Sequence, residues 1–164
     1  MTSEYLEKVR EVIDPMNTPI SVLLSHKGAV VYSVAGRDTV AEAVREMSFR
    51  NIGSVVVLEN GLLTGLLTER DVLTRVVAAG RQPDLTCVAD VMTRHPVVVS
   101  SRATVEEVMN LFTEKRCRQI PVLDEDTGRL VGLVSIGDAT RWVVELHRNE
   151  ANQLRQYIAG SFAG

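Results

Sequence analysis

The sequence contains few of the residues that build disulfide frameworks or membrane spans. Its 164 residues include only two cysteines, Cys87 and Cys117, and they form no Cys-x-x-Cys pair. A disulfide scaffold is therefore not expected, and we predict two reduced thiols in a cytoplasmic protein. Uninterrupted apolar runs are short, such as residues 55–58, far below the ~18 residues of a membrane span. The beginning of the chain carries charges where a signal peptide needs an apolar stretch.

Positive charge and aromatic side chains are also scarce. The net charge is −3, and aromatic residues make up 4% of the chain. Nucleic acids and membrane surfaces are therefore not expected as partners. The basic run at residues 115–118 has no interleaved aromatic residues, so a phosphate-binding or solvent-exposed role is favoured over nucleic-acid binding. The two arginines beside Cys117 can lower the pKa of its thiol, which keeps a redox role as a minor alternative.

The sequence lacks the motifs of common catalytic and metal centres. It has no Gly-x-Ser-x-Gly, no P-loop and no His-centred triad. The three histidines are scattered along the chain, and no His/Cys cluster has the spacing of metal ligands. We therefore predict neither an enzyme nor a metal site.

The sequence does contain an internal repeat. Apolar residues make up 45% of the chain and charged residues 24%, which is typical of a globular protein. When the chain is shifted by 65 residues, residues 34–42 fall on residues 99–107 with five of nine positions identical. A gap of two residues in the turn at 124–129 then aligns Asp71 with Asp138. We predict two copies of one unit, packed face to face about a pseudo-twofold axis with a pair of related clefts.

Each copy is predicted to fold in the order β-α-β-β-α, which gives an α/β (α+β) protein. In the first copy we predict strands at 30–34, 54–58 and 62–67, an Asn-Gly turn at 60–61, and helices at 39–50 (N-capped by Asp38 or Thr39) and 69–78. In the second copy we predict strands at 96–99, 119–123 and 130–134, a helix at 104–114 and a last helix capped by Ser135. Outside the repeat we predict helices at 4–13, at 21–24 and onward from Trp142 to about residue 158. The expected divisions are an N-terminal helical extension (1–19), two repeat domains (20–82 and 83–145) and a C-terminal helix (146–164).

Each copy ends in the pattern Gly-apolar-x-[Ser/Thr]-x-x-Asp at a strand-to-helix junction, with Thr68 and Asp71 in one copy and Ser135 and Asp138 in the other. Free N–H groups and the positive end of the helix dipole favour an anion there. The aspartate can accept hydrogen bonds from ribose hydroxyls, and the glycine can let a ligand approach the backbone. A single such turn is more often a capping box without a ligand, but two at matching positions favour binding. Because the two turns serve separate clefts, the aspartates do not form an acid–base pair.

These features together resemble a known family. The repeat order, the two turns, the segment Asp90-Val-Met-Thr93 and the segment Arg118-Gln-Ile-Pro-Val122 look like a tandem pair of cystathionine-β-synthase (CBS) domains, the Bateman module. The resemblance covers residues 20–145, and the tail after Trp142 is similar to stand-alone CBS-pair proteins. It implies a non-enzymatic regulatory module that binds an adenosine-containing ligand. AMP is expected first, with ATP, ADP or NAD(H) possible and S-adenosylmethionine as the alternative.

The resemblance also assigns residues. It places Asp71 and Asp138 on ribose, and Thr68 and Ser135 near phosphate. Arg70 and Arg118 have no arginine at the matching position of the other copy. Both are phosphate candidates and would favour phosphorylated adenosine over S-adenosylmethionine. Adenine is expected against the first strands and the starts of the second strands, at Val31, Tyr32, Ser33, Ile52, Gly53, Ser54 and Val55, and at Val97, Val98, Val99, Gln119, Ile120 and Pro121.

The expected assembly is a homodimer of four CBS units that signals to an unidentified protein partner. A ligand that contacts strand and helix ends within each cleft would shift the population of relative unit or subunit angles. The alternative is a constitutive interaction scaffold whose clefts are vestigial.

Overall fold

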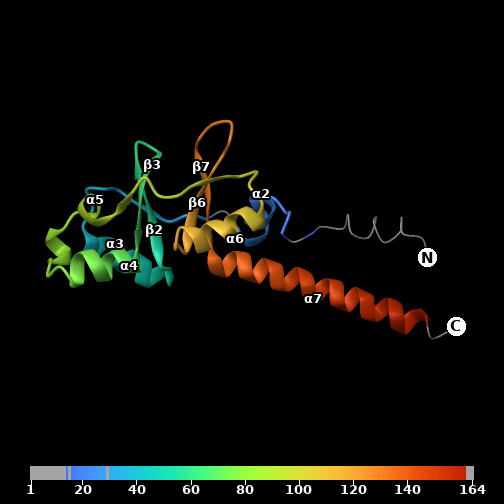
Figure 1. Cartoon of the computed structure of the whole chain (residues 1–164). Helices are drawn as coiled ribbons and strands as arrows, with labels where there is room; N and C mark the ends of the chain where they lie inside the picture. Colours follow the sequence, from blue (N-terminus) through green and yellow to red (C-terminus); the bar gives the residue numbers. More distant parts are fainter. Residues whose placement is uncertain (1–13, 15, 29, 162–164) are drawn as a thin grey trace.

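The structure is a computed structural model that describes residue 14, residues 16–28 and residues 30–161 (Figure 1). It has two small sheets with helices packed against them, and it confirms the predicted pair of β-α-β-β-α units. The first unit comprises β1 (Ser33–Val34), α3 (Val40–Arg50), β2 (Ser54–Glu59), β3 (Leu62–Thr68), α4 (Glu69–Asp71) and η1 (Val72–Val77). The second unit comprises β5 (Val99–Ser100), α6 (Val105–Glu114), β6 (Gln119–Leu123), β7 (Leu130–Ser135) and α7 (Ile136–Ser161). The helix predicted at 4–13 lies outside the described residues.

A leading segment precedes each unit along the chain. The first leading segment, residues 16–28, contains α2 (Ile20–Lys27), whose predicted position was correct. The second, residues 82–95, contains η2 (Pro83–Leu85), α5 (Val88–Val91) and β4 (Thr93–Arg94), which the sequence patterns did not predict. These elements are only two to four residues long, too short to produce a helical or alternating pattern.

The main helix of each unit begins at a capping box. The Thr39 hydroxyl accepts a hydrogen bond from the Glu42 N–H, and the Glu42 carboxylate accepts one from the Thr39 N–H at 2.8 Å. Thr104 and Glu107 repeat this arrangement at the start of α6, with the corresponding N–H to carboxylate distance at 2.7 Å. Thr39, and not Asp38, is therefore the N-cap of α3. Such a cap stabilises a helix by about 1 kcal/mol, which explains why both helices begin where the repeat predicts.

The strands form two sheets with the orders β1-β2-β3-β4 and β5-β6-β7. In each, the first strand pairs parallel to the second, and the second forms an antiparallel hairpin with the third. Asn60 and Gly61 both have positive φ angles (51° and 77°), as the Asn-Gly turn predicts. The first strands were predicted too long: only Ser33–Val34 and Val99–Ser100 pair, and Val30 is 71% exposed.

The last helices of the two units differ in length and form. The helix predicted at 69–78 is a short α-helical turn, α4, followed by the π-helical segment η1, where the Ala78 N–H donates to the Leu73 carbonyl. In the second unit, α7 continues for 26 residues and extends far beyond the two sheets (Figure 1). It ends at Ser161, slightly later than predicted. The repeat is therefore least exact after the aspartate of each turn.

Each leading segment packs on the unit that it does not lead into. Ile20, Leu23 and Leu24 of α2 are buried in the core of the second unit, with Val108, Phe112 and Trp142. Val88, Val91 and Met92 of the second leading segment are buried in the core of the first unit, with Val40, Met47 and Leu67. Each fully buried aliphatic side chain contributes about 1.5–3 kcal/mol. The connection that enters one unit therefore stabilises the other.

Backbone hydrogen bonds fix this crossed packing at matching positions. The Val40 N–H donates to the Thr86 carbonyl, and the Val105 N–H donates to the Thr18 carbonyl, both at 2.9 Å. A β-bridge joins Thr39 to Cys87, and another joins Pro19 to Thr104. The duplication therefore includes the leading segments, although their sequences differ too much for the repeat to be evident there.

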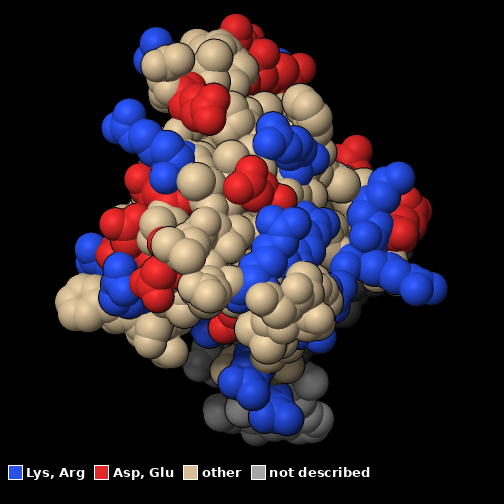
Figure 2. All heavy atoms as spheres, turned by 90° about the vertical axis from the view of Figure 1, so that its left-hand side faces the viewer, with Lys and Arg blue, Asp and Glu red and all other residues tan. Residues whose placement is uncertain are grey.

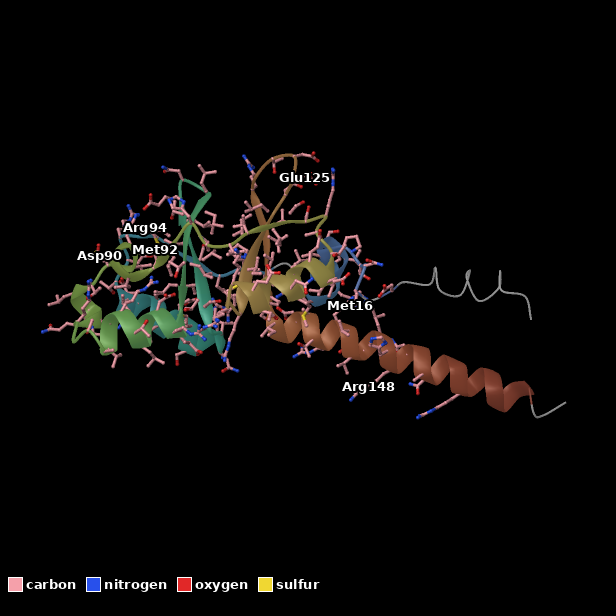
Figure 3. All side chains as sticks on the ribbon, in the orientation of Figure 1. Met16, Asp90, Met92, Arg94, Glu125 and Arg148 are labelled. Carbon is pink, nitrogen blue, oxygen red and sulfur yellow. The ribbon has the colours of Figure 1, made fainter. Side chains whose placement is uncertain are left out.

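The crossed packing also explains the glycine of each strand-to-helix turn. A Cβ on Gly65 would collide with the Met92 side chain, and a Cβ on Gly132 would collide with Leu24. Figure 3 shows Met92 beside the first sheet. These glycines therefore make room for a buried side chain of the leading segment. That they also let a ligand approach the backbone stays a prediction.

Candidate functional site

Both strand-to-helix turns hold their aspartate in a capping box. The Asp71 carboxylate accepts hydrogen bonds from the Thr68 N–H (3.0 Å) and hydroxyl (2.7 Å). The Asp138 carboxylate accepts the same pair from Ser135, at 2.9 Å and 2.7 Å. In both turns the two donors reach Oδ2. The predicted pair of hydroxyl and carboxylate is therefore fixed in the same way in both units.

The surroundings of Asp71 use both of its carboxylate oxygens. The Thr93 hydroxyl donates to Oδ1 at 3.1 Å, and Arg75 Nη1 lies 3.3 Å from the same oxygen. Arg75 also donates to the carbonyls of Val91 (2.8 Å) and Met92 (2.9 Å), so it joins η1 to the end of α5. The Asp71 side chain is only 9% exposed. This carboxylate is an integral part of the contact between the first unit and the second leading segment.

The surroundings of Asp138 are more open. Lys27 Nζ lies 2.6 Å from Oδ2 and donates to the Leu133 carbonyl at 2.7 Å. The Asp138 side chain is 21% exposed, and its carboxylate borders a cavity of about 220 Å³ that Lys27 and Trp142 also line. Burial raises the pKa of this carboxyl, but hydrogen bonds from Lys27 and Ser135 outweigh burial and hold the pKa below its ordinary value.

Each aspartate therefore meets the leading segment of the other unit. Asp71 of the first unit contacts Thr93, which leads into the second unit, and Asp138 of the second unit contacts Lys27, which leads into the first. Each turn therefore combines the carboxylate of one repeat with the connection into the other, and a cavity borders the turn of Asp138. The sequence did not predict this crossing, because the two partners of the Lys27–Asp138 pair lie 111 residues apart. Thr18 and Leu24 have the same spacing in the sequence as Thr86 and Met92. This equal spacing was the signal that could have shown that the leading segments correspond to each other.

Comparison with known proteins identifies the repeated unit. The profile of the CBS domain matches residues 9–78 and again residues 88–145. This chain belongs to the CBS-domain family. The two units described above are its CBS domains, and the resemblance inferred from the sequence is confirmed.

The similarity extends over both CBS domains. CBS domain-containing protein CBSX3, mitochondrial, of Arabidopsis thaliana is 41% identical over 130 residues, which are 76% of this chain but only 62% of that relative's length. CBS domain-containing protein YhcV of Bacillus subtilis is 34% identical, with 80% of this chain and 84% of YhcV covered. The solved CBS domain structure NE2398 has a TM-score of 0.73 at 36% identity, covering 77% of this chain and 98% of that one. The chain is therefore a CBS-domain pair, a regulatory module of a family not known for catalysis.

The predicted phosphate-binding arginines of the CBS-domain pair lie at its surface. Arg70 Nη1 donates to the carbonyl of Arg116 in the other CBS domain at 3.4 Å, and the Arg70 side chain is exposed. Arg118 is also exposed, and its carbonyl accepts a hydrogen bond from the Ile136 N–H at 2.9 Å. In the described part of the chain, neither arginine forms an ion pair with Asp71 or Asp138. Their role toward phosphate stays a prediction.

The predicted adenine-pocket residues of the CBS domains divide into two groups. Val55 and Ile120 are fully buried in the two cores, and Ser54, Val99 and Pro121 are also buried, so they can offer a ligand mainly backbone groups. The others are partly or fully exposed: Val31, Tyr32, Ser33, Ile52, Gly53, Val97, Val98 and Gln119. Gly53 and Gln119 lie close together, since the Gln119 amide nitrogen is 3.7 Å from the position of a Cβ on Gly53. The starts of β2 and β6 therefore meet between the CBS domains.

Other candidate chemistries receive no support from the described residues. Burial raises the pKa of the Cys117 thiol, so the lowering expected from its neighbouring arginines was wrong. Within residues 14, 16–28 and 30–161, no group of three or more His, Cys, Asp or Glu side chains is placed to hold a metal ion. No helix in the same part of the chain is long and apolar enough to cross a membrane. Figure 2 shows acidic and basic side chains interspersed over one end of the molecule.

Proposed function

We propose that this CBS-domain pair binds an adenine nucleotide and transmits its binding to a partner protein. AMP is the first candidate, with ADP, ATP and NAD(H) as the others. The observation that carries the proposal is the matched pair of turns, each holding a hydroxyl and a carboxylate against the leading segment of the other repeat, with the Asp138 turn bordering a cavity. A duplicated carboxylate beside a helix start suits recognition of a ribose with an attached phosphate.

The geometry favours the Asp138 cleft as the more accessible one. Among the described residues, all donors to the Asp138 carboxylate reach Oδ2, so Oδ1 is available to accept a ribose hydroxyl. Both oxygens of Asp71 already accept hydrogen bonds. PAE2072 of Pyrobaculum aerophilum, which is complexed with AMP, has the same fold with a TM-score of 0.66 at 23% identity. The ligand of that protein supports AMP as the first candidate here.

The proposed mechanism is a population shift. A ligand in either cleft contacts an aspartate of one CBS domain and the leading segment of the other, so its affinity depends on their relative position. The exposed apolar side chains Val44, Phe49, Leu73 and Val77 lie on α3 and η1. This surface suits self-association into the predicted homodimer. A partner that binds one arrangement better would then sense the nucleotide.

Thermal unfolding of nucleotide-free protein tests this function. AMP, ADP, ATP, NAD⁺, NADH and S-adenosylmethionine are added separately, and a ligand at a hundred times its Kd adds about 2.7 kcal/mol of stability. The melting temperature should then rise by roughly 5–10 °C with at least one adenine nucleotide. A larger rise with S-adenosylmethionine than with AMP would contradict the preference for phosphate. No rise with any of the six would overturn the proposal and favour a constitutive scaffold.

A further inference from the structure

The C-terminal helix α7 extends beyond the domain that supports it. Its first half is anchored in the second CBS domain, where Trp142 is buried and Val143 and Leu146 pack partly buried against the same core. The helix then continues to Ser161, far outside the two sheets (Figure 1). The projecting part, residues 147–161, is about 22 Å long at 1.5 Å per residue. A helix of this length is only marginally stable in water unless one face is packed.

The sequence indicates that the apolar stripe of α7 continues beyond the domain. Leu154 and Tyr157 follow Leu146 at the spacing of one helical face. Arg148 and Arg155 are exposed, and their spacing assigns them to the opposite, polar side of the helix. An amphipathic pattern that continues past the domain indicates that another apolar segment packs on the projecting part.

The N-terminal residues enter the structure beside this stripe. The Met16 carbonyl accepts a hydrogen bond from the Glu106 N–H at 2.9 Å, and the Met16 side chain packs partly buried against the same core as Leu146. Figure 3 shows Met16 at the end of the second domain from which α7 projects. Thirteen residues precede Asp14 in the sequence. They are therefore tethered where the apolar stripe of α7 leaves the domain, which gives them a high effective concentration there.

The helix predicted at 4–13 supplies a matching apolar face. Ten residues at 1.5 Å each make a helix of about 15 Å, which fits on the projecting part of α7. Its apolar residues recur at helical spacing: Tyr5, Leu6, Val9, Val12 and Ile13. Because the end at Ile13 is tethered where α7 leaves the domain, this helix can follow α7 only in the antiparallel direction.

We infer that the apolar side of the projecting part of α7 is a docking surface for residues 4–13 of the same chain, which pack on it as an antiparallel helix. The two segments then form a helical hairpin beside the second CBS domain. This hairpin joins α7 to the first leading segment a second time, beyond the contact between Lys27 and Asp138.

The spacing of apolar residues defines the register of the hairpin. Ile13 and Tyr5 lie eight residues apart, and Leu146 and Leu154 have the same separation. An antiparallel arrangement therefore brings both apolar pairs into contact at once, with Ile13 nearest the domain.

Charge favours residues 4–13 over a second copy of α7 as the occupant. Glu150 lies midway between the two leucines of the stripe, and this register places it opposite Val9, whose neighbours Lys8 and Arg10 are basic. Two copies of α7 aligned through the same leucines would instead bring the two Glu150 carboxylates together, which is unfavourable.

Disulfide cross-linking tests the contact and its register. The two native thiols are first removed by Cys87→Ser and Cys117→Ala. In this background, Tyr5→Cys/Leu154→Cys should oxidise to a disulfide within one chain. Tyr5→Cys/Arg155→Cys is the matched control, and because Arg155 is exposed on the polar side of α7, this pair should cross-link about tenfold or more slowly. Non-reducing gel electrophoresis separates disulfides within a chain from those between chains.

Hydrogen exchange tests whether docking protects α7. Val9→Glu places a charge on the apolar face of the docked segment, and Ser3→Glu adds the same charge before the predicted helix as the matched control. In Val9→Glu the amides of residues 147–161 should exchange about tenfold or more faster than in wild type, because the projecting helix loses its packed face. Ser3→Glu should leave their exchange unchanged, and the amides of the two CBS domains should exchange as in wild type in both variants.

Equal cross-linking rates for the two cysteine pairs, or unchanged exchange of residues 147–161 in Val9→Glu, would overturn the inference. A disulfide that forms only between two chains would also overturn it and identify a second copy as the occupant. None of these outcomes bears on nucleotide binding, which the thermal panel measures separately.

Discussion

The two CBS domains hold the same turn, but they use its aspartate differently. Asp71 is 9% exposed and accepts hydrogen bonds on both oxygens, whereas Asp138 is 21% exposed and accepts them on Oδ2 alone. The difference comes from outside the turn. Thr93 and Arg75 complete the first site, and Lys27 completes the second. A duplicated motif therefore fixes where a carboxylate lies, and the packed neighbour decides whether it is available to a ligand.

The position four residues after each aspartate strengthens this contrast. In the first domain it is Arg75, which holds the end of α5 through two carbonyls. In the second domain it is Trp142, which is 9% exposed and packs in the core against the side of α2. At this position the first domain holds the second leading segment with a charged side chain, and the second domain holds the first leading segment by apolar contact. The charge in the second cleft is thereby left to Lys27.

Truncating the two aspartates should reveal the largest difference in folding stability between the two CBS domains. Asp71→Ala leaves the Thr93 hydroxyl and the Arg75 guanidinium without their acceptor in a buried place, which costs about 3 kcal/mol. Asp138→Ala leaves Lys27 more exposed to water and costs about 1–2 kcal/mol. Urea unfolding of both variants measures the difference. Equal losses would show that the surroundings of the two aspartates do not differ in energy.

Replacing the two turn glycines by alanine should give the opposite order of stability losses, with the larger loss in the second domain. Gly132→Ala forces the Cβ against the branched end of Leu24, and overpacking of this kind costs about 2–3 kcal/mol. Gly65→Ala meets Sδ and Cγ of Met92, whose unbranched side chain can move, and comes within 3.1 Å of the Thr93 carbonyl oxygen, so we expect a cost of about 1–2 kcal/mol. Leu24→Ala combined with Gly132→Ala should be less destabilising than the sum of the two single changes. Additive losses in that double-mutant cycle would contradict the proposed contact.

Acid should remove the contribution that the ionised form of Asp138 makes to folding stability. Its pKa is lower in the folded protein than in the unfolded chain, so its ionised form stabilises the fold above the unfolded value of about 4. This stability is lost as the pH falls through the lower folded pKa. The melting temperature of wild type should exceed that of Asp138→Asn at pH 7, by the equivalent of about 1 kcal/mol, and the gap should narrow as the pH falls from about 4 through the lower folded pKa. A gap that stays constant down to that acidity would show that the charge of Asp138 contributes nothing.

Local patterns in the sequence predicted the parts of the fold that depend on neighbouring residues. The capping threonines of α3 and α6, the Asn60-Gly61 turn and the buried strand β2 all lie where the repeat indicates. The Thr68–Asp71 and Ser135–Asp138 pairs were also predicted, because they lie three residues apart. In these cases the physical cause is contained in one short segment.

The crossed packing of the leading segments could not be predicted in the same way. Whether Leu24 packs on its own unit or on the other depends on tertiary contacts that a single sequence does not show. The partner of Asp138 follows from that packing, and so does the role of the turn glycines. The contact of Lys27 with Asp138 was therefore not predicted, while Arg70 and Arg118 were chosen as phosphate candidates because they break the repeat.

Calorimetric titration of AMP into wild type and into Asp71→Asn/Asp138→Asn tests the central claim most directly. Asparagine keeps an oxygen that accepts the Thr68 and Ser135 hydrogen bonds, so the double variant should fold, as its circular dichroism can verify. The account predicts saturable binding to wild type and a loss of about a hundredfold or more in the double variant, because each cleft loses charge-assisted bonds to ribose. Equal AMP affinity in a folded double variant would contradict this account and show that the aspartates of the duplicated turns do not bind the ligand.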